Sequence, residues 1–119
     1  MNHLRRNKKV LYLCKRKEEN GKIIFEQPER YLLNYQPLNS VGEIVAVGNE
    51  YINRLIFYTN METGKNFHNF DRCYVYKELP EQYNKFVCDG DFYVDGEPQV
   101  YMEEVTVFLQ RMTGDDLDV

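Results

Sequence analysis

The sequence has 119 residues, of which 43% are hydrophobic, and a formal net charge of −4. This length and composition suit a single globular domain and leave too little chain for two independent cores. No apolar run approaches the roughly 20 residues that cross a bilayer, and the first residues lack the apolar stretch and cleavage site of a signal peptide. We therefore expect synthesis in the cytoplasm and no membrane association. Three widely spaced cysteines predict buried, unpaired thiols in a reducing compartment.

Charge is distributed unevenly along the chain. Residues 1–17 carry seven basic side chains and no acidic one, whereas residues 78–119 carry eleven acidic side chains and only two basic ones. Such polarity predicts complementary contacts between copies or with different partners at the two ends. Two solvated tails would explain the same pattern.

The first half of the chain reads as short strands. Residues 1–8 form a basic arm that we expect to be flexible, and residues 9–16 form a β-prone run. A hairpin turn at residues 19–22 leads to a second extended run at 23–25. Residues 29–36 alternate, with Tyr31, Leu33 and Tyr35 on one face and Leu32, Asn34 and Gln36 on the other.

The second half continues in the same manner. We expect an irregular loop at residues 39–50, a strand at 52–59, and a polar connection at 60–70 with Gly64 at its tip. A strand at 72–78 precedes an irregular or helical crossover. Asp95 and Gly96 predict the turn of a hairpin whose long second strand covers residues 99–111, and residues 113–119 form an acidic tail that we expect to be disordered.

No helical period is sustained over ten residues, and ten Tyr and seven Phe favour strands. The prediction is an all-β domain over residues 9–112, a small barrel or sandwich of about six or seven strands with long loops.

The residues that carry chemistry do not form a recognisable site. His3 and His68 have no partner at metal-ligand spacing. Cys73 or Cys88 as a nucleophile would need His68 as its base, and we favour buried structural thiols instead. Asp89 and Asp91 read as turn residues, and adjacent Glu103 and Glu104 point to opposite faces of a strand. No glycine-rich phosphate loop is present. The sequence therefore predicts no catalytic residues, no metal and no cofactor.

Nucleic acid is the remaining ligand class. A small barrel rich in Tyr and Phe with a basic arm could stack bases on a strand face. Against this, the strand aromatics are not interleaved with many Lys or Arg, and the chain is acidic overall. Core and interface packing accounts for the same rings.

The layout of the whole chain resembles the head-closure, or stopper, proteins of the neck of tailed bacteriophages. The segments that carry the likeness are NKKVLYLCKR, RYLLNYQPLNSVGEIVAVG, INRLIFYT, FDRCYVYKELP and the closing DFYVDGEPQVYMEEVTVFLQRM. Cys73 in the FDRCYVY run is a departure from this likeness and corresponds to no role in the family. Tail terminators add clear helices and portal adaptors are mainly helical, so the stopper position is preferred.

The resemblance implies a β-barrel structural protein of the virion neck, assembled in the host cytoplasm into a sixfold or twelvefold ring. Its partners would be the portal-adaptor ring and tail proteins, and packaged DNA would be met only non-specifically. Candidate interface or channel residues are Val41, Glu43, Ile44, Asn49, Lys65, Phe67 and His68, and the candidate partner-facing arm carries Arg5, Arg6, Lys8 and Lys9.

Two alternatives stay open from the residues themselves. One is a β-barrel module that binds single-stranded nucleic acid through the aromatic residues and the basic arm. The weaker one is an enzyme that uses Asp89, Asp91 or Glu103.

Overall fold

A computed structural model describes residues 8–38 and 52–113 of the chain. The arm up to residue 7, the loop at 39–51 and the tail from residue 114 lie outside these ranges. Within the described ranges, one helical turn accompanies the strands, α3 (Met61–Gly64). The strands are β1 (Lys9–Cys14), β2 (Arg16–Glu19), β3 (Lys22–Phe25), β4 (Glu29–Leu33), β5 (Gln36–Pro37), β6 (Arg54–Asn60), β7 (Arg72–Tyr74), β8 (Phe92–Val94), β9 (Gln99–Tyr101) and β10 (Glu104–Arg111).

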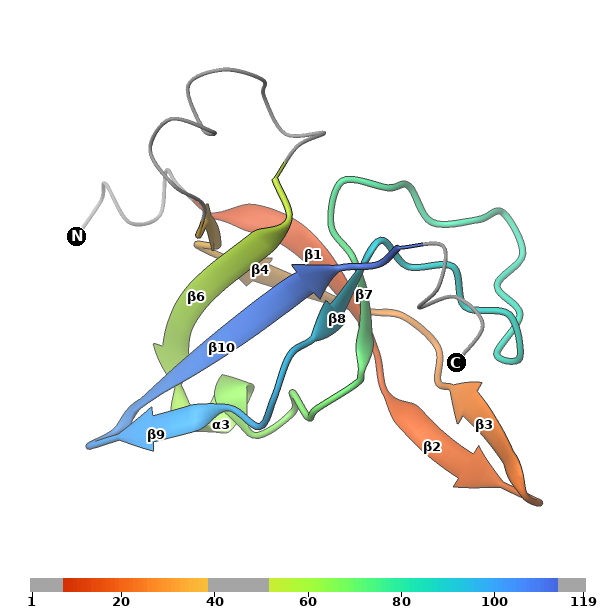
Figure 1. Ribbon diagram of the computed structural model, residues 1–119, viewed down its shortest axis with the longest axis horizontal. Helices are drawn as coiled ribbons and strands as arrows, with labels where there is room; N and C mark the ends of the chain where they lie inside the picture. The colour runs from red at the N-terminus through yellow and green to blue at the C-terminus, as the bar shows by residue number, and fades with distance from the viewer. Residues whose placement is uncertain (1–7, 39–51, 114–119) are drawn as a thin grey trace.

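The main sheet is a curled half-barrel (Figure 1). Its strands follow the order β4-β1-β7-β8-β10-β6-β5, and β9 pairs with β10 beside this path. All neighbouring strands are antiparallel. Only Asn34 and Tyr35 separate β4 from β5 in the chain, yet these strands lie at opposite ends of the sheet. The sheet must therefore curl. The high strand content and the near absence of helix confirm the predicted all-β class.

The concave side of the sheet holds the core. The predicted alternation in residues 29–36 is confirmed, because Leu33 and Tyr35 are buried and Tyr31 packs against the same cluster. In β10 the buried residues are Val105, Val107 and Leu109. The Phe67 ring lies 5.1 Å from that of Phe57 and 5.3 Å from that of Tyr31, within the range of favourable aromatic packing. Leu11, Leu13, Leu55, Phe92 and Val94 are fully buried in the same core.

A second, two-stranded sheet projects from the half-barrel. Strands β2 and β3 pair with each other, and the turn between them has positive φ at Asn20 and Gly21. This is the Asn-Gly hairpin turn that the sequence predicts, because these two residues adopt left-handed backbone angles readily.

Three predicted elements differ from the structure. Gly64 is buried rather than at a loop tip, since α3 packs on β10 and a Cβ at Gly64 would lie 2.6 Å from Cβ of Val105. The predicted strand 72–78 stops at Tyr74, because the backbone N–H groups of the next two residues donate to Asp91 instead of to a neighbouring strand.

The third difference concerns the predicted long strand 99–111. It is two strands, β9 and β10, which fold back on each other at Met102 and Glu103. The turn depends on Met102, which has φ of 57°. Sequence rules assign this left-handed conformation to Gly, Asn or Asp rather than to methionine, so the turn was not predicted.

Candidate interaction surface

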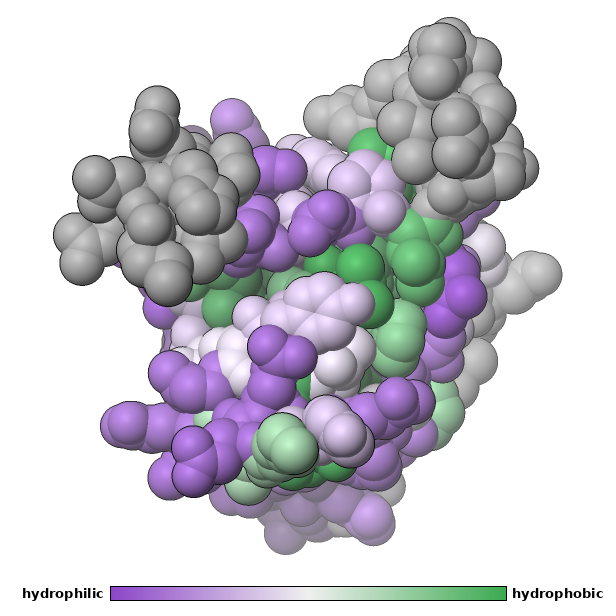
Figure 2. All heavy atoms as spheres, turned by 90° about the vertical axis from the view of Figure 1, so that its left-hand side faces the viewer, coloured by the Kyte–Doolittle hydropathy of each residue, from purple (hydrophilic) through white to green (hydrophobic). Residues whose placement is uncertain are grey.

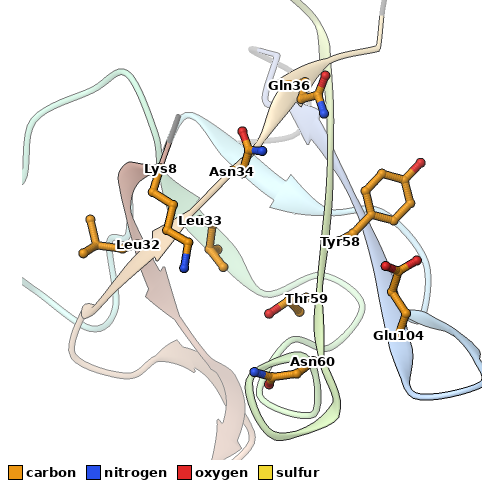
Figure 3. A pocket seen from close by; sticks show the side chains of 9 residues that line it. All are labelled: Lys8, Leu32, Leu33, Asn34, Gln36, Tyr58, Thr59, Asn60 and Glu104. Atoms are coloured by element: carbon orange, nitrogen blue, oxygen red, sulfur yellow. The ribbon is translucent and has the colours of Figure 1, made fainter. Parts of the chain in front are cut away.

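A groove opens between the two ends of the curled sheet, where β4 faces β6 (Figure 3). It has a volume of about 580 Å³. Four lining residues come from the β4 side and its continuation, and three come from consecutive positions of β6. The lining residues are Lys8, Leu32, Leu33, Asn34, Gln36, Tyr58, Thr59, Asn60 and Glu104.

The groove exists because the sheet closes at only one end of the gap. After β4, the chain passes through Asn34 and Tyr35, and β5 then pairs with β6 at Ile56 and Leu55. Beyond Ile56, the outer edge of β6 has no strand partner in the part of the chain that the structure describes, and the outer edge of β4 has none either. Unpaired strand edges present backbone N–H and C=O groups that can pair with another chain.

The groove is mixed in character. Leu32 and Tyr58 are half exposed at its mouth, at 49% and 50%, and Lys8 and Glu104 supply opposite charges. Figure 2 looks onto this side of the molecule and shows hydrophobic and weakly polar side chains at its centre, with hydrophilic ones gathered below and to the left. A rim of charge around an apolar centre is the usual composition of a protein–protein contact.

The β9–β10 hairpin carries the two most exposed large hydrophobic side chains of the described chain, those of Met102 and Tyr101. Val100, Tyr101 and Met102 are exposed by 56%, 77% and 82%. All three residues of β9 are exposed, and β10 is its one strand partner in the described chain. An exposed apolar strand with an open edge is a feature that soluble proteins otherwise avoid.

The structure separates the predicted interface residues of the loop at 60–70. Lys65 is exposed just after α3. The ring of His68 is exposed, whereas its backbone N–H donates to Oδ2 of Asp71 at 2.9 Å. Phe67, by contrast, is 1% exposed and fills the core, so its side chain does not face a partner. The other predicted loop residues, Val41, Glu43, Ile44 and Asn49, lie outside the described residues.

The predicted basic arm is described only at its end. Arg5 and Arg6 lie outside the described residues, and Lys8 lines the groove. Lys9 belongs to β1, where its Nζ donates to the carbonyl oxygen of Tyr35 at 3.4 Å and lies 5.0 Å from the centre of the Tyr35 ring. Lys9 is thus bound to the barrel.

The carboxylates considered for catalysis have structural partners. Asp91 accepts the backbone N–H groups of Val75 and Tyr76 at 2.8 and 2.9 Å. Asp89 accepts the Tyr74 hydroxyl at 2.6 Å and Nζ of Lys77 at 2.8 Å. Burial opposes ionisation of Asp89, but the hydrogen bonds from Lys77 and Tyr74 outweigh it and hold the pKa of this carboxyl below its usual value. These contacts fix the irregular segment between β7 and β8.

Glu103, the third carboxylate considered, is exposed at the turn of the β9–β10 hairpin. Within residues 8–38 and 52–113, no group of three or more His, Cys, Asp or Glu side chains has the arrangement of a metal site.

Asp71 is the one buried acid in the described chain, at 2% exposure. Its carboxylate accepts the backbone N–H of Arg16 at 2.8 Å and that of His68 at 2.9 Å. Burial raises the pKa of Asp71, and the hydrogen bonds from Arg16 and His68 oppose the rise. The aspartate of the FDRCYVY run therefore joins the start of β2 to the loop before β7.

The three cysteines are buried and free, which confirms the prediction of buried, unpaired thiols. Cys14 and Cys88 share a small cluster with Phe25 and Tyr74. A hydrogen bond with Cys88 raises the pKa of Cys14, and the same bond lowers the pKa of Cys88. Cys73 lies in the main core, where burial raises its pKa well above the usual value. A buried neutral thiol is a poor nucleophile, so Cys73 has a packing role.

The aromatic rings proposed for base stacking belong mostly to the interior. Phe57 and Tyr74 are at most 1% exposed, and Tyr31 and Tyr76 pack against the core cluster. Tyr58 is the strand aromatic that the groove presents.

Sequence reasoning placed Leu32 on the outer face of its strand but attached no function to it, and it did not single out Tyr58 or the β9–β10 turn. The run QVYME, with apolar residues next to a cluster of acids, was the available signal for an exposed hairpin. The groove itself had no local signal, because its two sides lie more than 20 residues apart in the chain.

Comparison with protein-family models, curated proteins and solved structures finds no match to this chain. In the described part of the chain, no helix is long and apolar enough to cross a membrane.

Proposed function

We propose that this chain is a structural protein that works by assembly, and specifically a ring-forming head-closure protein of a tailed-phage neck. The observation that carries the first step is the pair of open strand edges, at the groove and at β9, together with the exposed apolar hairpin. These features suit contacts between protein copies. The second step rests on the resemblance in layout along nearly the whole sequence.

The charge distribution supports the same proposal. A basic N-terminal end suits acidic neighbours of a portal assembly, and an acidic C-terminal end lowers affinity for phosphate in a DNA-filled channel. The protein would join the portal-adaptor ring to the tail and close the channel.

The test is a density-gradient fractionation of lysate from the producing cells, with this chain followed by mass spectrometry. Co-migration with assembled particles at a few copies each supports the neck assignment. Recovery only among free proteins contradicts it.

The alternative, a module for single-stranded nucleic acid, has one favourable observation: Lys8 and Tyr58 line the same groove. A cation and an accessible ring are the elements of such sites. This alternative requires that the chain bind oligonucleotides with an affinity that falls as the salt concentration rises and that is lost when residues 1–9 are deleted. Absence of binding, or binding unchanged by the deletion, excludes it.

A further inference from the structure

Two of the open strand edges, those of β6 and β9, face in opposite directions. Residues 104–106 of β10 pair with residues 58–60 of β6 on one edge and with residues 99–101 of β9 on the other. This part of the sheet therefore has the order β6-β10-β9. Its outer edges are the groove edge of β6 and the free edge of β9, and in the described chain neither has a strand partner along these residues.

Opposite edges allow head-to-tail contact. If the β9 edge of one copy adds to the groove edge of β6 in the next, one edge stays free at each end of the series. Contacts of this heterologous kind propagate, and they form a closed ring when the rotation between copies permits. A two-fold dimer would instead pair like edges, β6 with β6 or β9 with β9.

The chemistry of the two edges is complementary. The hairpin segment 95–104 carries four acidic residues and no basic one, around the apolar Val100, Tyr101 and Met102. The groove is lined by Lys8 and by exposed Leu32 and Tyr58, and Arg30, two residues before Leu32 in β4, is also exposed. Glu104 is the one acidic residue that lines the groove, and it belongs to β10, the second strand of the hairpin.

We propose that the β9 strand of one copy pairs with the free edge of β6 in the groove of the neighbouring copy. The partner of the groove is thus a second copy of this chain. This inference deepens the proposed function and rests on it for the claim that the head-to-tail series closes as a ring.

The contact is small. Three residues of strand span about 10 Å at roughly 3.3 Å each, and Tyr101 adds at most about 150–250 Å² of buried surface. A stable interface between two proteins buries about 1,200–2,000 Å² in total. Free copies are therefore monomeric when dilute, and a ring forms when a preceding ring holds several copies together.

Disulfide trapping tests the pairing directly. Gln99 and Tyr58 lie on the same face of the sheet, because both are opposite Thr106 in the register, and both are exposed. In the double variant Gln99→Cys/Tyr58→Cys at high protein concentration, diamide would oxidise one thiol from each of two copies to a disulfide and take up the two hydrogens. We expect a ladder of oligomers beyond the dimer that reductant collapses.

The controls separate head-to-tail pairing from other contacts. Each single variant can form at most a dimer, and the native chain forms none because its three thiols are buried. The matched double variant Gln99→Cys/Val87→Cys places the second thiol outside the groove at a more exposed site, 67% against 50% for Tyr58, and is expected to give no ladder. A Gln99→Cys/Tyr58→Cys variant that stays monomeric, stops at dimers, or matches this control overturns the inference.

The result is distinguishable from failure of the proposed function. Co-migration with particles without a ladder would reject the β9–β6 pairing and leave the neck assignment standing. A ladder from a chain never found in particles would support the pairing and reject the neck assignment.

Discussion

Strands β2–β3 and β9–β10 form two short antiparallel hairpins that project from the half-barrel, at lower right and lower left in Figure 1. The first exposes charged and polar residues apart from Ile23, and the second exposes Val100, Tyr101 and Met102 at its tip. Their attachment also differs. A hydrogen bond from the backbone N–H of Arg16 to the buried carboxylate of Asp71 fixes the base of β2–β3, whereas packing of Val105 against Gly64 fixes the base of β9–β10.

The difference teaches that similar local geometry serves two purposes. A charged hairpin is protected from pairing with other chains, because edge charges oppose aggregation. An apolar hairpin with an open edge has no such protection. We infer that β2–β3 is kept solvated and that β9–β10 is reserved for a partner.

The largest expected effect comes from removing the carboxylate that fixes β2–β3. Asp71→Ala leaves the backbone N–H groups of Arg16 and His68 without an acceptor at a buried site. We expect a loss of about 2–3 kcal/mol in the free energy of unfolding, measured by urea denaturation. Asp95→Ala removes a half-exposed acid whose Oδ2 lies 3.8 Å from Nη2 of Arg54; it is the control and should change stability little. Equal losses for both would reject the anchoring role of Asp71.

At the base of the β9–β10 hairpin, stability should depend on side-chain volume rather than on charge. A Cβ at Gly64 would lie within 2.8 Å of all three side-chain carbons of Val105. Gly64→Ala is therefore expected to cost about 1–3 kcal/mol through overpacking. In the double variant Gly64→Ala/Val105→Gly all three clashing carbons are gone, so the two losses should be less than additive. A thermal melt of the four proteins gives the coupling, and strict additivity would contradict direct contact.

The two turns offer a matched comparison of backbone strain. Asn20 and Met102 both have left-handed φ, 53° and 57°, but asparagine tolerates this region far better than methionine. Met102→Gly should stabilise the fold by up to about 1 kcal/mol, after the entropy cost of glycine is subtracted, and Asn20→Gly should gain less. Chemical denaturation of both variants checks the order, and the reverse order would show that strain at Met102 is not significant.

The smallest effect is expected at the ion pair that links β2–β3 to the segment before β8. Nζ of Lys85 lies 3.3 Å from Oε1 of Glu19, and both side chains are more than 40% exposed. Lys85→Ala should cost at most about 1 kcal/mol, with a difference from the native chain that shrinks at high salt. A larger, salt-independent loss would mean that the backbone carbonyl of Lys85, which accepts from Phe25 at 2.9 Å, is displaced as well.

Local sequence pattern was sufficient for several elements. Alternation separated the two faces of residues 29–36, and Asn20-Gly21 predicted its hairpin, because strand period and turn chemistry are properties of adjacent residues. Sequence pattern failed at Met102, because nothing nearby in the sequence indicates a left-handed methionine. It also failed at Val75 and Tyr76, because their backbone N–H groups donate to the carboxylate of Asp91, 15 or more residues away.

The sequence by itself determined that the chain is an all-β domain with buried thiols and an uneven distribution of charge. Only the tertiary structure decided which residues face a partner. It moved Phe67 into the core, brought Leu32 and Tyr58 to the two sides of one groove, and left β9 and β6 as opposite open edges. The physical reason is that alternation fixes which side of a strand is buried, whereas the curl of the sheet fixes which edges remain unpaired.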